Sequence, residues 1–383
     1  MQKKYDYEIL ILGAGASGLF CASFLKNSNS AIIESNQTAG KKLQISGGGK
    51  CNLTNEFVTS QNYFGNSEFV DSVLRKYDQK KVLEFFKNRG VELVIRSQGQ
   101  YFCTKSSNEI LKVLGDETRS IKKYFDHKII NVEKKDDIFF VYTDKKVFKS
   151  QKIIVATGGL SYKIIGADEI GFKIASEFGH TITPLKPALV GFTVQKEQFW
   201  FKNLSGISFK VAMSVDKKKF EDELLFAHKG ISGPVVLNAS LYWEKGQIKI
   251  DFLPNIDLKK LLKNSKKQIS SILPIPKRFI KEFLQSIELE DKSVDSLTQE
   301  DFKKLAIIKN YEFSPAGNFG YTKAEATRGG VNTDEIDQNT MQSKKINGLY
   351  FIGEVTDVTG ELGGYNLQWA FSSGFVCAKS LAV

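Results

Sequence analysis

The sequence predicts an α/β protein built around a parallel nucleotide-binding sheet, and its two ends carry the main evidence. A strand-like run at 7–12 leads into the glycine turn GAGASG at 13–18, and a second apolar strand follows a short helix at 30–34. Near the other end, GLYFIGEV at 348–355 forms a strand that closes in glycine, and LGGYN at 362–366 opens the last helix. We therefore expect the two ends to complete one site.

Bulk composition sets the outer limits of this prediction. A chain of 383 residues exceeds one comfortable core, so two or three domains are expected. With 42% hydrophobic and 25% charged residues, the composition is that of a soluble globular protein. The first residues lack the architecture of a signal peptide and no apolar run is long enough for a membrane span, so a cytoplasmic protein is expected.

Cysteine and histidine usage argues against a metal site. The four cysteines are widely spread and form no CxxC pair, which also argues against a redox-active disulfide. The three histidines are too few and too scattered to hold an ion. We predict no metal. The residues concerned are Cys21, Cys51, Cys103, Cys377, His127, His180 and His228.

The pattern along the chain predicts that the first domain is interrupted. Three short strands at 127–156 return to the sequence ATGG, and a second region begins near Pro184 and Pro187 with alternating strands. A helical pattern follows at 257–308. The expected segments are a cofactor domain at 1–186 and 336–383, a β-rich insert at 187–255 and 310–335, and a helical domain at 256–309.

GAGASG has the spacing of a dinucleotide fingerprint. Gly13 allows the tight turn, Gly15 lets backbone approach a pyrophosphate, and Gly18 permits close packing of helix on strand. Glu34 ends the second strand about 20 residues on, where a carboxylate accepts hydrogen bonds from ribose hydroxyls. Because the C-terminal glycines are also needed, the prediction is FAD, whose ring lies far from its adenosine.

A second glycine-rich stretch, AGKKLQISGGGKCNLTN at 39–55, is expected to press against the same cofactor. Lys42 could meet phosphate, and the glycines at 47–49 could pass over the flavin ring without a Cβ to clash. Cys51 either faces the flavin as a proton donor or fills space as a buried structural thiol.

Two further motifs complete the expected FAD site. ATGG at 156–159 ends a buried strand where the chain must approach the cofactor, and Gly353 with Glu354 is expected to meet the ribityl chain. N–H groups at the start of the last helix would point at the flavin edge that becomes negative on reduction. The full set expected to contact FAD is Gly13, Gly15, Ser17, Gly18, Glu34, Ser35, Lys42, Ser46, Gly47, Gly48, Cys51, Asn52, Ile129, Thr157, Gly158, Gly353, Glu354, Gly363, Gly364, Tyr365 and Asn366.

Candidate substrate groups lie outside these motifs. His228, in AHKGISGP, could act as a general acid or base, although a histidine in a turn is more often structural. Arg328 sits on a glycine turn as if to meet an anion, with an ordinary surface arginine as the alternative. The net charge is +11, and eight basic residues with no acidic one fall between 259 and 281, including Lys259, Lys260 and Lys263. Such a stripe is either a phosphate-backbone footprint or a solvated helix face.

The motifs SGGGKCNLTN, ATGGLSY, PALVGF, HKGISGP, RGGV and GEVTDVTGELGGYNLQWAFSSG resemble those of the BaiN/YhiN-type bacterial flavoproteins over nearly the whole chain. The resemblance implies a glutathione-reductase-like FAD domain interrupted by a β-rich domain and a small helical domain. Lys163 and Gly191 stand where this family usually has proline, and Ala227 replaces a usual threonine. These departures spare the glycine motifs.

The resemblance implies an FAD-dependent oxidoreductase that takes electrons transiently from NADH or NADPH. The C-terminal LGGYNLQWAFSSG looks most like that of members that reduce uridine to dihydrouridine in large-subunit ribosomal RNA, which also fits the basic stripe at 259–281. Cys51 and His228 are then the candidate proton donors. The alternatives are a small-molecule oxidase or reductase, such as an aminoacetone oxidase, and a flavin-binding protein without catalysis.

Overall fold

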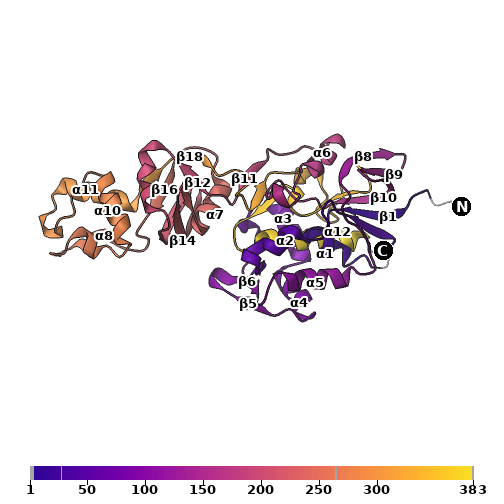
Figure 1. Ribbon diagram of the computed structural model, residues 1–383, viewed down its shortest axis with the longest axis horizontal. Coiled ribbons are helices and arrows are strands. Elements are labelled where there is room, and N and C mark those ends of the chain that lie inside the picture. Colours follow the sequence, from indigo (N-terminus) through magenta and orange to yellow (C-terminus); the bar gives the residue numbers. More distant parts are fainter. Residues whose placement is uncertain (1–3, 27, 264, 382–383) are drawn as a thin grey trace. The chain divides into compact units, whose positions relative to one another are not determined.

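The computed structural model describes residues 4–26, 28–263 and 265–381, and the chain divides into two compact units (Figure 1). Unit 1 comprises Met1–Pro187 and Glu325–Val383. Unit 2 comprises Ala188–Ala324. Each unit has its own hydrophobic core.

The parallel part of the unit 1 sheet carries the predicted nucleotide-binding strands. Strand β1 (Tyr7–Leu12) lies between β2 (Ser30–Ile33) and β10 (Val147–Val155) and is parallel to both. Strand β7 (Lys122–Tyr124) extends the sheet beyond β2, and β20 (Leu349–Phe351) pairs with the end of β10. The N-terminal and C-terminal motifs therefore reach the same edge of one sheet, which confirms the α/β fold class.

Antiparallel strands complete unit 1. The predicted three-strand meander is confirmed as β8 (Ile129–Lys135), β9 (Ile138–Thr143) and β10. A small sheet is formed by β3 (Asn52–Asn55), β6 (Gln100–Cys103) and β5 (Leu93–Ile95). Two short pairs join β4 (Tyr63–Gly65) with β21 (Val358–Gly360), and β11 (Lys186–Ala188) with β19 (Ala326–Arg328).

The helices of unit 1 pack around this sheet, and the first and last of them lie against each other. Helix α1 (Ala16–Ala22) packs on α12 (Tyr365–Leu381) through buried residues of both (Figure 1). The expected helix at 68–90 is two helices, α3 and α4, each begun by a side-chain N-cap. The others are α2 (Lys41–Ile45), α3 (Ser67–Lys76), α4 (Gln79–Lys87), α5 (Asn108–Glu117) and α6 (Ile170–Glu177).

Unit 2 is built on one antiparallel sheet in the order β17-β16-β13-β14-β15-β12-β18. The long hairpin of β13 and β14 forms its centre, and helix α7 (Pro234–Tyr242) packs on it. The strands are β12 (Phe192–Val194), β13 (Ser208–Val215), β14 (Lys218–Ala227), β15 (Gly230–Ser232), β16 (Ile248–Asp251), β17 (Tyr311–Phe313) and β18 (Pro315–Asn318).

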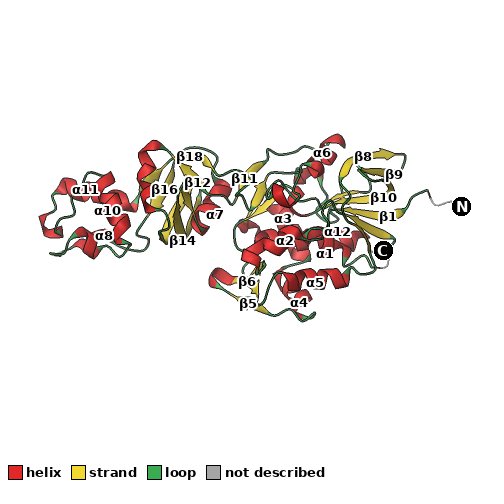
Figure 2. Cartoon of the chain, in the orientation of Figure 1, coloured by secondary structure: helices red, strands yellow, loops and turns green. Residues whose placement is uncertain are grey.

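The helical pattern at 257–308 is a set of short helices that gather at one end of unit 2 (Figure 2). Prolines at 274 and 276 separate two of them, because proline cannot continue a helix from the preceding turn. They are α8 (Leu258–Leu262), α9 (Ile269–Ile272), α10 (Lys277–Ser286) and α11 (Gln299–Ala306).

The division of the chain differs from the five predicted segments in two places. The helices and the β-rich sheet share one core, in which Phe252 of the sheet region packs on Phe279 of α10, so they form one unit. The returning chain also joins unit 1 at Glu325 instead of after 335, because Val331 pairs with Val355 and lies in the unit 1 core.

Candidate functional site

The turn between β1 and α1 is as tight as the fingerprint predicts. A Cβ added at Gly13 would lie 2.5 Å from the carbonyl oxygen of Ala156, and one at Gly18 would lie 2.1 Å from that of Gly13. Side chains at these positions would push the helix away from the sheet. The two glycines therefore set the approach of α1 to the ends of β1 and β10.

Next to these two tightly packed glycines, Gly15 and Gly158 border open space. An added Cβ would meet nothing within 4 Å at Gly15 or at Gly158, where backbone borders free space. Two buried polar atoms, Oγ1 of Thr157 and Oδ1 of Asn52, have no hydrogen-bond partner among the described residues. Gly15 and Gly158 follow the neighbouring parallel strands β1 and β10, so this open backbone fits a bound dinucleotide that would fill the space. Asn52 belongs to β3 of another sheet, where its unpaired amide oxygen is available to accept a hydrogen bond from a ligand.

Glu34 comes directly after β2, next to the predicted strand end, and is 8% exposed. Its Oε2 accepts a hydrogen bond from the Ala14 N–H at 2.8 Å, and its Oε1 accepts from the backbone and side chain of Asn36, each at 2.8 Å. Ser35 Oγ also donates to Oε1 at 3.3 Å. Since each carboxylate oxygen has two acceptor positions, Oε2 keeps one for a ribose hydroxyl.

Lys42 and Glu354 form an ion pair with each other, which differs from the separate contacts expected for them. Lys42 Nζ lies 2.6 Å from Glu354 Oε2 and donates to Ser161 Oγ at 2.7 Å. Glu354 Oε1 accepts from the Thr327 N–H at 2.9 Å and from Ser161 Oγ at 3.3 Å. This cluster joins four segments of unit 1 around a neutralised carboxylate.

The turn before α12 is held by its own side chains. Asn366, expected to contact the flavin ring, donates to the Gly360 carbonyl at 2.9 Å and accepts from the Gly360 N–H at 2.8 Å. A Cβ at Gly364 would lie 2.7 Å from the Thr54 carbonyl, and Gly363 accepts from Asn55 Nδ2 at 3.1 Å. The amide of Asn366 is therefore committed to the turn, which leaves the backbone N–H groups to face a ligand.

The glycine loop at 46–51 ends at Cys51, whose thiol contacts the thiol of Cys103. Cys51 is fully buried with a φ of 50°, and Cys103 hydrogen-bonds its thiol. This bond and burial raise the pKa of Cys51 well above its usual range. Cys21 and Cys377 pair similarly between α1 and α12. All four thiols are free, and both contacts form between segments distant in sequence, so the spacing of the cysteines along the chain does not reveal them.

The remaining predicted cofactor residues lie in unit 1 near the same elements. Ser17 is buried in α1, and a Cβ at Gly353 would lie 2.6 Å from its Oγ. Ser46 Oγ donates to the Leu43 carbonyl at 2.7 Å. Gly47 and Gly48 both have positive φ, and Ile129 is the buried first residue of β8. Tyr365 accepts from the Tyr63 hydroxyl at 3.0 Å through its carbonyl.

The predicted substrate residues are divided between the two units. Arg328 in unit 1 is buried, with its guanidinium 4.0 Å from the centroid of the Phe64 ring, so it is not the ordinary surface arginine of the alternative prediction. His228 is exposed in the turn between β14 and β15 of unit 2. Lys259, Lys260 and Lys263 are exposed on and after α8, also in unit 2.

The basic stripe is divided among three helices and their links, but its charges remain uncompensated. Its lysines have no carboxylate within ion-pair distance among the described residues. By contrast, Lys292 and Lys309, which follow in the same unit, pair with Asp301 and Asp251 at 2.8 and 2.9 Å. The uncompensated lysines are Lys259, Lys260, Lys263, Lys266, Lys267, Lys277 and Lys281.

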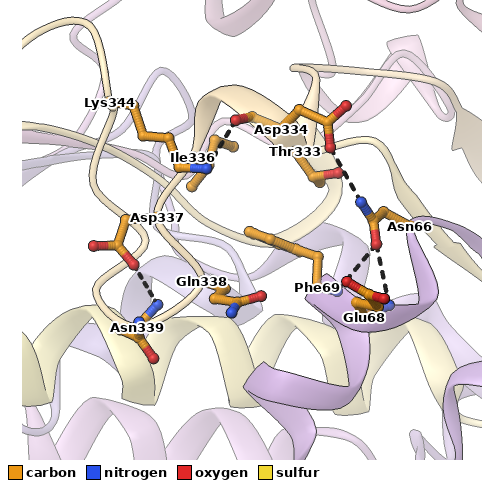
Figure 3. Close-up of a pocket in the computed structure, with 10 residues that line it drawn as sticks. All are labelled: Asn66, Glu68, Phe69, Thr333, Asp334, Ile336, Asp337, Gln338, Asn339 and Lys344. Atoms are coloured by element: carbon orange, nitrogen blue, oxygen red, sulfur yellow. Dashed lines mark hydrogen bonds between the residues drawn. The ribbon is translucent and has the colours of Figure 1, made fainter.

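Unit 1 also contains a polar hollow of about 450 Å³ (Figure 3). Its polar groups hydrogen-bond one another: Asn66 Nδ2 donates to Asp334 Oδ1 at 3.1 Å, and Asp337 Oδ1 accepts from the backbone N–H of Asn339 at 2.7 Å. None of the predicted cofactor residues lines it. The lining residues are Asn66, Glu68, Phe69, Thr333, Asp334, Ile336, Asp337, Gln338, Asn339 and Lys344.

Sequence reasoning missed Ser161 and Thr327, which complete the Lys42–Glu354 cluster. Ser161 lies in ATGGLSY and Thr327 directly precedes Arg328, and their small hydroxyl side chains are the available signal. Over residues 4–26, 28–263 and 265–381 there is no group of three or more potential metal ligands. Over the same ranges no helix is long and apolar enough to cross a membrane.

Together the glycine turn, the carboxylate after β2 and the open sheet edge form a Rossmann-type dinucleotide site, and the family match makes the chain an FAD-dependent oxidoreductase. The chain belongs to the family described as HI0933-like protein Rossmann domain, whose model matches residues 7–380. It is 36% identical to the ribosomal RNA dihydrouridine synthase of Haemophilus influenzae and 34% identical to that of Escherichia coli, with 98% of each chain covered. It is also 29% identical to a 3-dehydro-bile acid delta(4,6)-reductase of Clostridium scindens, over 97% of this chain and 98% of the relative.

Proposed function

We propose that this protein uses FAD, with NADH or NADPH as electron donor, to reduce uridine to dihydrouridine in ribosomal RNA. The observation that carries the proposal is the full-length similarity, at 34–36% identity, to two proteins named ribosomal RNA dihydrouridine synthase. The uncompensated lysines at 259–281 support it, because a polyanionic substrate would neutralise them.

The residues of unit 1 would divide the binding of FAD among them. The N–H groups of the Gly13–Gly18 turn would face the pyrophosphate, and the free acceptor position on Glu34 would take a ribose hydroxyl. Gly158 and the glycines at 47–49 would lie against the flavin portion. When bound, FAD supplies the hydride that the reduction requires.

Reduction of the C5–C6 bond of uracil also needs a proton at C5, and Cys51 and His228 are the candidates to deliver it. The raised pKa of Cys51, caused by Cys103 and by burial, keeps its thiol protonated near neutral pH. His228 is exposed and free to reach a large substrate. Loss of a general acid lowers turnover by about 100-fold to 10,000-fold.

Mapping dihydrouridine in ribosomal RNA from a deletion strain tests the proposal. The modification should disappear in the deletion strain and return with the wild-type gene. Complementation with Cys51→Ala and with His228→Gln should identify the proton donor, since loss of the true donor stops the modification while purified protein keeps its flavin. Unchanged dihydrouridine in the deletion strain would rule the function out.

A small-molecule reductase is the second candidate, favoured by the full-length similarity to the bile acid reductase. In that case the lysines at 259–281 are incidental, and replacing Lys259, Lys260 and Lys263 with glutamine would leave turnover unchanged. A flavin-binding protein without catalysis is the third. It would be supported by a bound flavin that neither NADH nor NADPH reduces in the presence of substrate.

A further inference from the structure

An exposed aromatic side chain lies under a cation on the surface of unit 2. Phe199, in the 3₁₀ segment η5 (Lys196–Leu204), is 46% exposed. Lys202 Nζ lies 3.5 Å from the centroid of its ring, close enough for a cation–π contact. Its neighbours Trp200 and Phe201 instead point inward and pack with Tyr311.

Contacts with α10 fix this segment beside further positive charge. The Arg278 guanidinium donates to the Asn203 carbonyl, and Asn203 Nδ2 donates to Glu282 Oε2 at 2.8 Å. Trp200 packs on Phe279 with 5.8 Å between ring centroids. Two residues that follow Phe199 in the chain, Trp200 and Asn203, therefore hold η5 against α10.

The solvent face of α10 carries basic side chains that do not stabilise the helix itself. The helix buries Phe279 and Phe283, which leaves Lys277, Arg278 and Lys281 toward solvent, while the half-buried Glu282 accepts from Asn203. Cations in the first turn of a helix oppose its dipole, so the charges at 277 and 278 do not stabilise it. The face suits an anionic partner that approaches from solvent.

An exposed ring among cations matches the chemistry of single-stranded RNA. Unpaired bases stack on aromatic side chains, while lysine and arginine track the phosphates. We propose that Phe199 stacks with an unpaired base of the RNA substrate while Lys202, Lys277 and Arg278 hold the adjoining phosphates. This rests on the proposed function and assigns it a recognition site distinct from the lysines of α8.

The test is a binding titration of flavin-loaded full-length protein with a fluorescent oligouridine and with an RNA duplex of equal length. Phe199→Ala should weaken oligouridine binding about tenfold or more, whereas Phe199→Trp should restore it. Lys202→Gln should lower the salt dependence of binding. The matched control is Phe302→Ala, which removes a phenylalanine 39% exposed on α11 of the same unit and should leave the affinity unchanged.

Three results would overturn the proposal: an unchanged affinity of Phe199→Ala, an equal loss in Phe302→Ala, or equal wild-type affinity for single-stranded RNA and duplex. Binding to anionic lipid vesicles but not to oligouridine would assign the face to a membrane instead. This test is separate from the test of the proposed function. If RNA binding depends on Phe199 but the protein forms no dihydrouridine in ribosomal RNA, the RNA-binding surface stands and only the proposed reaction is wrong.

Discussion

The cofactor region of unit 1 and the helical region of unit 2 differ in whether their charged side chains have partners within the protein. In unit 1, Lys42 is paired with Glu354 at 2.6 Å, and Glu34 is bound to the Ala14 N–H. From 259 to 281 in unit 2, the lysine ammonium groups lack carboxylate partners among the described residues. In the first region, a ligand would meet backbone N–H groups and open glycine backbone. In the second region, it would meet lysine ammonium groups that have no carboxylate partner.

The largest effect should come from the glycine turn. Gly18→Ala places a Cβ 2.1 Å from the Gly13 carbonyl and should lower the free energy of unfolding by about 1–3 kcal/mol, with loss of flavin. Gly15→Ala meets nothing within 4 Å, so apo stability should change by less than about 0.5 kcal/mol. We nevertheless expect it to weaken FAD binding about tenfold, because its methyl group enters the space assigned to the pyrophosphate.

Chemical denaturation of the apo proteins and titration with FAD separate these two effects. Wild-type flavin affinity in Gly15→Ala would mean that the open space is not where the pyrophosphate lies.

A smaller effect is expected from the ion pair of Lys42 and Glu354. Lys42→Met leaves the carboxylate without its cation, and Glu354→Gln removes the charge itself. Since the Lys42 side chain is 39% exposed, solvent screening limits the coupling to about 1 kcal/mol in a double-mutant cycle of unfolding free energies. If the changes in unfolding free energy of the two single variants add up to that of the double variant, the ion pair contributes nothing to stability.

The smallest effect concerns pH and the buried His180. Burial lowers the pKa of His180, an effect that Glu335 only partly opposes, and Nε2 of His180 bonds Ser343 Oγ at 2.8 Å. A lowered pKa means that the folded state favours the neutral ring, so its stability is full above the unfolded pKa of about 6.5 and declines as the pH falls below it. Thermal unfolding at pH 7.5 and 5.5 should show a smaller loss for His180→Gln than for wild type, and an equal loss would contradict this role.

Local backbone motifs could be predicted from the sequence, and long-range side-chain pairs could not. The turn at Gly13–Gly18 and Glu34 follow from spacing within one βαβ unit, and they lie where expected. Lys42 and Glu354 are 312 positions apart, so only the folded chain reveals that they neutralise each other. The thiol pair of Cys51 and Cys103 likewise depends on the pairing of β3 with β6.

The same reasoning applies to unit 2, in which the helical segment and the β-rich sheet share one core. Hydrophobic periodicity identified helices and strands in unit 2, but it does not show that Phe252 and Phe279 share a core. The aromatic surface at Phe199 was also missed, because the run FWF places one exposed ring beside two inward ones without any alternation that marks the difference.

The most direct test of this contrast is a pair of titrations, with FAD and with a ribosomal RNA transcript, on two variants. Gly15→Ala should lose FAD affinity and keep RNA affinity. The triple variant Lys259→Gln, Lys260→Gln, Lys263→Gln should keep FAD affinity and lose about tenfold in RNA affinity at low salt. Wild-type RNA affinity in the triple variant would contradict the assignment of the uncompensated charge to an RNA partner.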